Sequence, residues 1–146
     1  MQVDFYHLTV TPVERALPGI AVKVVEGGGR LLIVSAEERQ RRQIDASLWT
    51  WQAESFLPHA QAGTGDDAIQ PVLIAEAVTP ANQARFVALI DGVWREQALA
   101  FERAFHFFDA DRIAEARSAW KALANREGVE RRYWKQDENG RWAQAA

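Results

Sequence analysis

The spacing of apolar residues divides the first part of the chain into a strand and a helix. Residues 3–8 form a short run of strand-forming side chains, and Thr11 and Pro12 then predict the cap and the first turn of a helix. Apolar residues recur at three- and four-residue spacing after that point, until Gly27–Gly29 should end the helix. Pro18 lies inside this predicted helix, where a proline can bend the chain.

The next elements repeat the same order. Leu31–Val34 is a continuous apolar run, which is typical of a strand buried on both faces of a sheet. Ser35 is expected to cap a polar helix from about Ala36 to Trp49. Strand, helix, strand, helix is the pattern of a parallel sheet. From Thr50 to Gln70 the periodicity fails, so we predict a long loop, and long loops in compact domains are often functional.

The second half of the chain adds further strands and one clear helix. The strongest helical periodicity lies between Asp111 and about Arg126, and Gly128 should end that helix. Asn139 and Gly140 favour a tight turn, so the carboxy-terminal segment is predicted to be a hairpin. The other expected elements are strands at 72–75, 85–90 and 101–108, a short helix near 93–100, and hairpin strands at 129–134 and 141–142.

The amino-acid composition is that of an ordinary folded globular protein. Of the 146 residues, 48% are hydrophobic and 25% are charged, which matches average globular usage and excludes a fibrous or disordered chain. We expect one domain, since a chain of this length fits a single core. No apolar run approaches the roughly 20 residues that span a bilayer, and the amino terminus lacks the features of an export signal. We therefore expect a cytoplasmic protein without membrane contact.

Residue types and charge narrow the possible chemistry further. The chain contains no cysteine, which excludes disulfides, thiolate nucleophiles and cysteine-based metal or iron–sulfur sites. The formal net charge of −3 argues against a general nucleic-acid binder. Residues 111–146 nevertheless carry eight basic and six acidic side chains, whereas the preceding part of the chain is acidic. A small basic patch for an anionic partner is therefore expected in the carboxy-terminal segment.

Three polar clusters resemble active sites only superficially. Gly27–Gly29 precedes a strand, whereas the glycines of a dinucleotide-binding fingerprint follow a strand and open a helix. Residues 62–65 resemble a phosphate loop, but no Gly-Lys-Ser/Thr sequence follows them. His59 has Asp66 and Asp67 nearby in sequence, yet no nucleophile accompanies them. We therefore expect no catalytic residue, no cofactor and no metal site.

Large apolar side chains gather between residues 48 and 59, at the start of the predicted loop. Trp49, Trp51 and Phe56 either fold back onto the core or form an exposed patch. Exposed tryptophan and phenylalanine are typical anchors for a protein partner. The sequence alone leaves both alternatives open.

Two cations and a tryptophan are neighbours on the predicted carboxy-terminal helix. Arg117, Trp120 and Lys121 lie at positions i, i+3 and i+4, so their side chains share one part of its surface. One interpretation is a core tryptophan beside ordinary solvated cations. The other is a site that captures the terminal carboxylate of a peptide beside an apolar side chain.

The same segments resemble a known family. Residues 48–59, LWTWQAESFLPH, are similar to a signature of the chi subunit of bacterial DNA polymerase III, in which Leu-Trp, Ser-Phe and Pro-His follow in that order, with Ala62-Gly63 at the expected distance. The resemblance extends over nearly the whole chain in family order. Its other parts are Phe5-Tyr6-His7-Leu8, Gln70-Pro71-Val72-Leu73-Ile74, Phe107-Phe108-Asp109, Ala116-Arg117, Trp120-Lys121-Ala122, Tyr133-Trp134-Lys135-Gln136 and Gly140-Arg141-Trp142.

The chi resemblance implies a fold and a type of function. The fold is a single three-layer α/β domain over residues 1–146, in which helices flank a mostly parallel sheet, and it is Rossmann-like without a phosphate-binding loop. The function is that of a non-catalytic accessory subunit of the DNA polymerase III holoenzyme, so the protein is no enzyme by itself. One alternative is an adaptor for a DNA-repair helicase. Another is a nucleotide-fold enzyme acting on a small phosphorylated substrate in the Thr50–Gln70 loop.

The resemblance implies a first partner site in the tryptophan-rich segment. The chi family binds the psi subunit, which connects it to the clamp loader. The matching positions in this chain are Trp49, Phe56 and His59. This implication favours the exposed patch over the alternative in which the aromatic side chains fold back onto the core. A helicase bound at the same patch is the other possible partner.

The resemblance implies a second partner site on the carboxy-terminal helix. The partner is the acidic carboxy-terminal tail of single-stranded-DNA-binding protein (SSB), and the matching positions are Arg117, Trp120 and Lys121. The two cations are expected to neutralise carboxylates of the tail, while the indole lines a pocket for its terminal aromatic ring. The protein would then contact nucleic acid only indirectly, through SSB.

Overall fold

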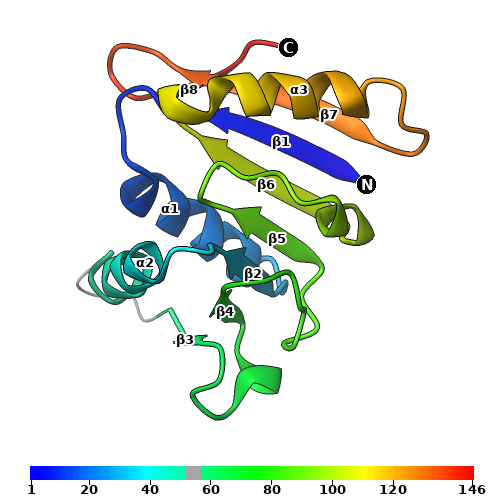
Figure 1. The fold of residues 1–146 in the computed structure, drawn as a ribbon. Coiled ribbons are helices and arrows are strands. Elements are labelled where there is room, and N and C mark those ends of the chain that lie inside the picture. Colours follow the sequence, from blue (N-terminus) through cyan, green and yellow to red (C-terminus); the bar gives the residue numbers. More distant parts are fainter. Residues whose placement is uncertain (52–56) are drawn as a thin grey trace.

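In the computed structural model, which describes residues 1–51 and 57–146, eight strands join into one sheet with three α-helices packed on it (Figure 1). The strands are β1 (Gln2–His7), β2 (Leu31–Val34), β3 (His59–Gln61), β4 (Val72–Ala75), β5 (Phe86–Leu89), β6 (Arg103–Phe108), β7 (Glu130–Gln136) and β8 (Trp142–Gln144). The helices are α1 (Val13–Glu26), α2 (Glu38–Thr50) and α3 (Ile113–Leu123). Short 3-10 turns lie at Asp67–Ile69 (η1), Glu96–Ala100 (η2) and Ala110–Arg112 (η3).

The strand order places the amino-terminal strand in the interior of the sheet. The order is β3-β4-β2-β5-β6-β1-β7-β8, and every neighbouring pair is parallel except β7 and β8, which form the predicted hairpin. β1 therefore lies between β6 and β7. Its Phe5 is opposite His106 of β6 and Tyr133 of β7. The mostly parallel sheet that the alternating pattern predicted is confirmed.

Helices cover both faces of the sheet and produce three layers. α1 and α2 pack on one face over a buried cluster that includes Leu17 and Ile44. α3 packs on the opposite face over a second cluster that includes Ala116 and Leu123 (Figure 1). The predicted α/β fold, with helices on both sides of the sheet, is confirmed. Among the described residues, no helix combines the length and the apolar character needed to cross a membrane.

Alternation along β1 sends neighbouring side chains to different layers. Val3 and Phe5 belong to the cluster beneath α3, whereas Tyr6 belongs to the cluster beneath α1. Asp4 shares the α1 face with Tyr6 and is fully buried, and Arg103 Nε donates a hydrogen bond to its carboxylate at 2.6 Å. A buried carboxylate is costly unless it is paired. This ion pair therefore fixes the start of β1 against β6.

The first helix starts without the predicted side-chain cap. Pro12 occupies the N-cap position of α1 and no side chain bonds there, so the prediction of Thr11 as the cap is wrong. Thr11 Oγ1 instead accepts a hydrogen bond from Gln136 Nε2 at 2.9 Å. Gln136 Oε1 accepts the backbone N–H groups of residues 9–11, each at 3.1 to 3.2 Å. The loop after β1 is thus tied to β7, and Thr11 is used for that contact.

The second helix starts later than predicted. α2 begins at Glu38 with Glu37 in the N-cap position, so Ser35 is not the cap of a helix that starts at Ala36. The Ser35 hydroxyl accepts the N–H of Glu37 at 3.1 Å and donates to Gln40 Oε1 at 2.6 Å. These bonds hold the turn between β2 and the first turn of α2. The serine therefore supports the helix from two residues further away than the sequence suggested.

The other predicted elements are largely confirmed. β2 and β4 have the predicted bounds, and β5, β6, β7 and β8 lie within or close to theirs. The prediction of an uninterrupted loop from Thr50 to Gln70 is wrong, because β3 pairs with β4 at the edge of the sheet and η1 follows it. The helix predicted near 93–100 is the 3-10 turn η2, and the predicted helix at 111–126 is divided into η3 and the shorter α3.

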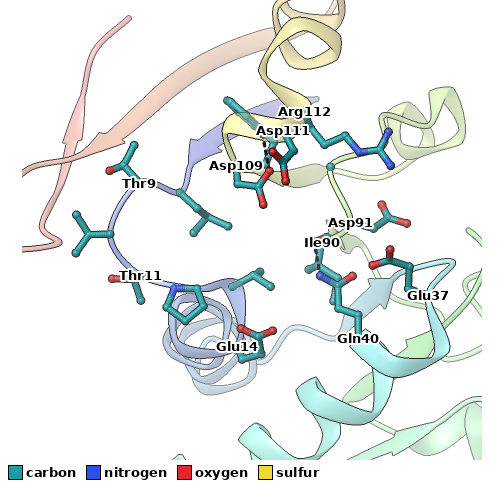
Figure 2. Close-up of a pocket in the computed structure, with 16 residues that line it drawn as sticks. Thr9, Thr11, Glu14, Glu37, Gln40, Ile90, Asp91, Asp109, Asp111 and Arg112 are labelled. Carbon is teal, nitrogen blue, oxygen red and sulfur yellow. Dashed lines mark hydrogen bonds between the residues drawn. The ribbon is translucent and has the colours of Figure 1, made fainter.

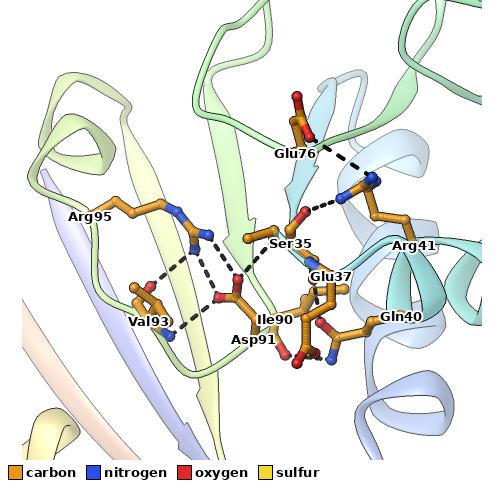
Figure 3. A network of polar contacts seen from close by, with 10 residues as sticks. Ser35, Glu37, Gln40, Arg41, Glu76, Ile90, Asp91, Val93 and Arg95 are labelled. Atoms are coloured by element: carbon orange, nitrogen blue, oxygen red, sulfur yellow. Dashed lines mark hydrogen bonds and ion pairs between the residues drawn. The ribbon is translucent and has the colours of Figure 1, made fainter.

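A polar network fixes the carboxyl ends of β2 and β5 (Figure 3). The Asp91 carboxylate accepts two hydrogen bonds from Arg95, at 2.7 and 2.8 Å, and the backbone N–H of Ala36 at 2.9 Å. Burial by itself raises the pKa of Asp91, but these bonds and the charge of Arg95 outweigh it and hold the pKa below its usual value. Gln40 Nε2 donates to the backbone oxygen of Ile90 at 2.8 Å, which anchors α2 to the same corner.

Candidate partner-binding sites

α3 presents a basic outer surface. Its inner side is apolar, and Ala116, Ala119 and Leu123 are buried against the sheet. Arg117 and Lys121 are exposed, and within the described part of the chain neither has an ion-pair partner. The helical spacing recognised in the sequence therefore brings two available cations together on one surface.

Trp120 joins this surface to the core and is partly buried. Its ring meets the rings of Phe5 and Tyr133 edge-on, at centroid distances of 5.3 and 5.6 Å. The Arg131 guanidinium lies over the indole at 3.9 Å from its centroid, and Arg131 Nη1 donates to the backbone oxygen of Trp120 at 2.6 Å. The tryptophan is thus both a packed residue and part of a basic surface, so the two interpretations of the sequence are compatible.

β7 adds residues to this surface that the sequence analysis did not assign to it. Alternation along β7 places Arg131, Tyr133 and Lys135 on the α3 face of the sheet. His7 of β1 lies opposite Lys135 in register. Burial lowers the pKa of His7, and the positive charges of Lys135 and Arg117 lower it further. We define the α3 basic surface as Arg117, Trp120, Lys121, Arg131, Tyr133 and Lys135.

Two other basic residues of the carboxy-terminal segment are directed elsewhere. Arg126 forms an ion pair with Glu96 of η2 at 3.0 Å. Arg132 alternates to the face opposite Arg131 and forms an ion pair with Glu130 at 3.3 Å. The positive charge of the segment is therefore divided between the two faces of the sheet.

The tryptophan-rich segment places aromatic side chains on the surface at the end of α2. Trp49 is 56% exposed, and its ring centroid lies 4.7 Å from that of His59. Trp51 is also exposed and lies beside Gly19 of α1. Phe56, the third residue predicted for this site, is outside the described residues. The structure therefore brings Trp49 and His59 together.

The imidazole of His59 is buried and has an oxygen atom near each ring nitrogen. Nδ1 is hydrogen-bonded to the backbone oxygen of Leu57 at 2.7 Å, whereas Nε2 lies 3.3 Å from Asp45 Oδ1 of α2 without forming a hydrogen bond. A pairing with Asp66 or Asp67, which the sequence analysis considered and set aside, is not formed among the described residues. His59 therefore packs β3 against α2 and lies against the exposed ring of Trp49.

A cavity of about 710 Å³ opens at the carboxyl ends of β1, β5 and β6 (Figure 2). Doubly wound folds bind their ligands at this edge of the sheet. Figure 2 shows Glu14 on the opposite side of the cavity from Asp109 and Asp111. The charged residues that line it are Glu14, Glu37, Asp91, Asp109, Asp111 and Arg112. Because carboxylates repel phosphate, this lining is unfavourable for a phosphorylated ligand, although no described residue of the Thr50–Gln70 loop, where the enzyme alternative placed its substrate, lines the cavity.

The acidic lining does not form a metal centre. Across residues 1–51 and 57–146, no group of three or more histidine or carboxylate side chains is placed to hold a metal ion. The two partner surfaces, rather than this cavity, are the candidate functional sites.

Most of the chain matches one protein family. A model of the family described as DNA polymerase III chi subunit, HolC, matches residues 1–130. The chain belongs to the DNA polymerase III chi subunit family. The part matched to the chi family contains α3 and the tryptophan-rich segment, and it ends at the first residue of β7.

Curated chi proteins from three bacteria resemble parts of the chain. The DNA polymerase III subunit chi of Escherichia coli is 39% identical over 66 residues, which cover 45% of each chain. The protein of the same name from Pseudomonas aeruginosa is 32% identical over 84 residues, covering 56% of this chain and 58% of the relative. A probable chi subunit of Rickettsia prowazekii is 22% identical over 89 residues, covering 61% and 54%. The chain thus matches about half the length of these relatives.

Proposed function

We propose that this chi family chain is an accessory subunit of a DNA polymerase III, without catalytic activity of its own, that joins the replicase to SSB in the cytoplasm. The family match over residues 1–130 supports a role in DNA replication. The observation that carries the proposal is the α3 basic surface, where exposed Arg117 and Lys121 adjoin the partly buried Trp120. The proposed ligand of this surface is the acidic carboxy-terminal tail of SSB.

The arrangement suits an acidic peptide that ends in an aromatic residue. Arg117 and Lys121 have no counter-ion among the described residues, so both are available to pair with carboxylates of the tail. The terminal aromatic ring would lie against Trp120, with Tyr133 beside it. Arg131 already lies over Trp120 and donates to its backbone oxygen, so we assign it to support of the indole rather than to capture of the tail.

The first test is the affinity of the chain for a fluorescently labelled peptide that carries the SSB tail. Arg117→Ala and Lys121→Ala are each expected to weaken binding about tenfold, because each removes one hydrogen bond to a charged group. Raising the salt concentration should weaken binding of the unaltered chain as well, since exposed charges are screened. Fluorescence anisotropy measures both effects.

Arg39→Ala is the matched control, because Arg39 is an exposed cation on α2, away from the proposed site. The Arg39→Ala variant should bind the tail peptide with the same affinity as the unaltered chain. Equal affinities of the unaltered chain and all three variants would mean that the tail binds at another surface. A complete lack of binding would remove tail capture from the proposed function, while membership of the chi family would stand.

We further propose that Trp49 and His59, together with Phe56 of the same sequence segment, bind a second protein, which is the psi subunit of the clamp loader or a DNA-repair helicase. The exposure of Trp49 supports this proposal, since exposed aromatic side chains are frequent anchors of protein interfaces. His59 is buried and bonded on β3, so its contribution is to hold the indole in place. A rigid anchor loses little conformational entropy on binding.

Trp49→Ala is expected to weaken binding of this second partner by about 2 kcal/mol, or roughly 30-fold, as for a typical interface anchor. Isothermal titration calorimetry with purified psi, and separately with the helicase, measures the effect and shows which partner uses the patch. Val10→Ala is the control, because Val10 is an apolar side chain of similar exposure in the loop after β1. Unchanged affinity of the Trp49 variant for both partners would contradict the proposed anchor.

A further inference from the structure

A second cavity, of about 700 Å³, lies on the α1 face of the sheet, between the carboxyl end of α1 and the amino ends of β5 and β6. We call it the amino-edge pocket. Its volume is within the usual range of ligand pockets. In contrast to the acidic cavity at the other edge of the sheet, its charged lining is mostly basic. The charged residues that line it are Lys23, Arg30, Arg85, Glu102 and Arg103.

Two guanidinium groups of the amino-edge pocket are held in place. Arg30 Nη1 donates to the backbone oxygens of Ala68 and Asn82, at 2.8 and 2.9 Å. Arg103 Nε donates to the buried Asp4 at 2.6 Å. An arginine has five N–H donors, so each guanidinium retains donors for a ligand. Because these side chains are already ordered, they lose little additional conformational entropy when an anion binds.

Two further cations stand at the mouth of the amino-edge pocket. Lys23 is exposed on α1 and has no ion-pair partner among the described residues. Arg85 forms an ion pair with Glu102 at 3.2 Å, and both side chains are largely exposed, so this pair is weak and is readily exchanged for a ligand. The pocket as a whole is therefore positively charged, although the chain carries a net charge of −3.

The floor of the amino-edge pocket is aromatic. Arg103 lies over the ring of Phe105 at 4.8 Å from its centroid. The ring of Phe86 approaches the backbone at Gly29 so closely that a Cβ there would lie 2.9 Å from Phe86 Cε2. A glycine at this position therefore lets the Phe86 ring close the end of the pocket. Basic groups and flat apolar surfaces thus alternate within one cavity.

An aromatic strip leads out of the amino-edge pocket across the α1 face of β1, β7 and β8. Tyr6 lines the pocket, and its ring is nearly parallel to that of Trp134, with centroids 6.1 Å apart. Trp142 meets Tyr6 edge-on at 5.0 Å. Trp134 Nε1 donates to Asp4 Oδ1 at 3.1 Å, which fixes the orientation of the indole. Both tryptophans remain partly exposed, so the strip offers ring surface to a ligand.

We propose that the amino-edge pocket and the adjoining aromatic strip bind a short segment of single-stranded DNA. The guanidinium groups receive a phosphate of the backbone, and bases stack on the tryptophan rings. Arginine presents several N–H groups to a phosphate in fixed geometry. Aromatic side chains combined with a basic groove are the usual means by which proteins hold single strands without reading their sequence.

A single strand fits these observations better than an acidic peptide does. Regularly spaced phosphates and flat bases match a basic pocket that continues into a row of rings, whereas a peptide carboxylate would leave the strip without a ligand. The surface lies on the face of the sheet opposite α3. The chain could then hold the SSB tail on one face and a DNA strand on the other, which goes beyond the proposed indirect contact with nucleic acid.

The test is the affinity of the intact chain for a fluorescein-labelled oligothymidine at low salt, measured by anisotropy. The double variant Lys23→Glu with Arg85→Glu should weaken binding about tenfold or more, because each cation near the strand contributes to a salt-dependent affinity. Both side chains are exposed, so the variant should fold. Trp142→Ala should weaken binding about tenfold through lost stacking. Arg39→Glu, a charge reversal on α2, is the control and should have a small effect.

Several outcomes would overturn the proposal. These are the absence of binding at low salt, an equal loss of affinity in the Arg39→Glu control, and an undiminished affinity in both the double variant and Trp142→Ala. If the double variant loses affinity for the SSB tail peptide and not for the oligothymidine, the pocket takes an acidic peptide instead. Arg117→Ala should leave oligothymidine binding unchanged, so the two surfaces are tested independently.

Discussion

Phe5→Ala is expected to lower the free energy of unfolding by about 4 kcal/mol, the usual cost of removing a fully buried phenylalanine ring. Phe5 is fully buried in the interior strand β1, beneath α3. His106, which meets it edge-on at 5.3 Å, is also fully buried, and burial lowers its pKa to about 4. The other ring neighbours of Phe5 are Trp94, Phe108, Trp120 and Tyr133.

The effect of Phe5→Ala is measured by urea unfolding, with Phe5→Leu as the matched variant. Leucine keeps most of the apolar volume, so the smaller substitution should cost clearly less than the alanine variant. Because Phe5 supports Trp120 from below, the alanine variant should also bind the SSB tail peptide more weakly under native conditions. A loss of less than about 1.5 kcal/mol would mean that the cavity collapses and that the ring cluster is not the centre of this core.

Arg103→Leu is expected to lower the free energy of unfolding by about 3 kcal/mol, because it leaves a buried carboxylate without its cation. Asp4 is fully buried, and Arg103 Nε is the charged donor that it faces. Trp134 Nε1 and Gln2 Nε2 also donate to it, at 3.1 to 3.2 Å. These neutral donors satisfy the oxygens but do not compensate the charge.

A double variant separates charge from packing at this pair. Asp4→Asn together with Arg103→Leu removes both charges, so it should be more stable than Arg103→Leu alone. Chemical denaturation of the single and double variants completes the cycle. If the double variant is the less stable of the two, the loss arises from packing around the arginine side chain and not from the unpaired carboxylate.

The strands of the sheet interior could be predicted from the sequence because they are apolar on both faces. Leu31–Val34 and Val72–Ala75 are continuous apolar runs, and all eight residues are buried in the structure. Exposing such a run to water would cost a large amount of free energy, so its apolar composition alone predicts that it is buried. β3 was missed because His59–Gln61 has no such run. Its strand conformation comes from pairing with β4, which is a tertiary effect.

The helix starts show a second limit of sequence reasoning. Thr11 is a good cap by residue type, but Gln136 competes for its hydroxyl from a strand that is distant in sequence. No residue near Thr11 in the sequence indicates the contact with Gln136. Local propensity therefore predicted the position of the helix correctly, but it assigned Thr11 the wrong role.

The basic surface was predictable only where it lies on one helix. Arg117 and Lys121 could be grouped because helical spacing makes them neighbours. Tyr133 and Lys135 could not be added until the structure showed that β7 lies beside β1 with Arg131 against α3. The aromatic strip on the other face depends on the same strand pairing, since it joins residues from both ends of the chain.

The interior position of β1 has a consequence for synthesis of the chain on the ribosome. The strand is synthesised well before its partners β6 and β7, and its Gln2 pairs with Arg103 and Glu130. β1 therefore cannot form its hydrogen-bond ladder until β6 has emerged, whereas β2, β4 and β5 can pair much earlier. During synthesis β1 therefore remains an unpaired, largely apolar segment, and such segments are prone to aggregation and recognised by chaperones.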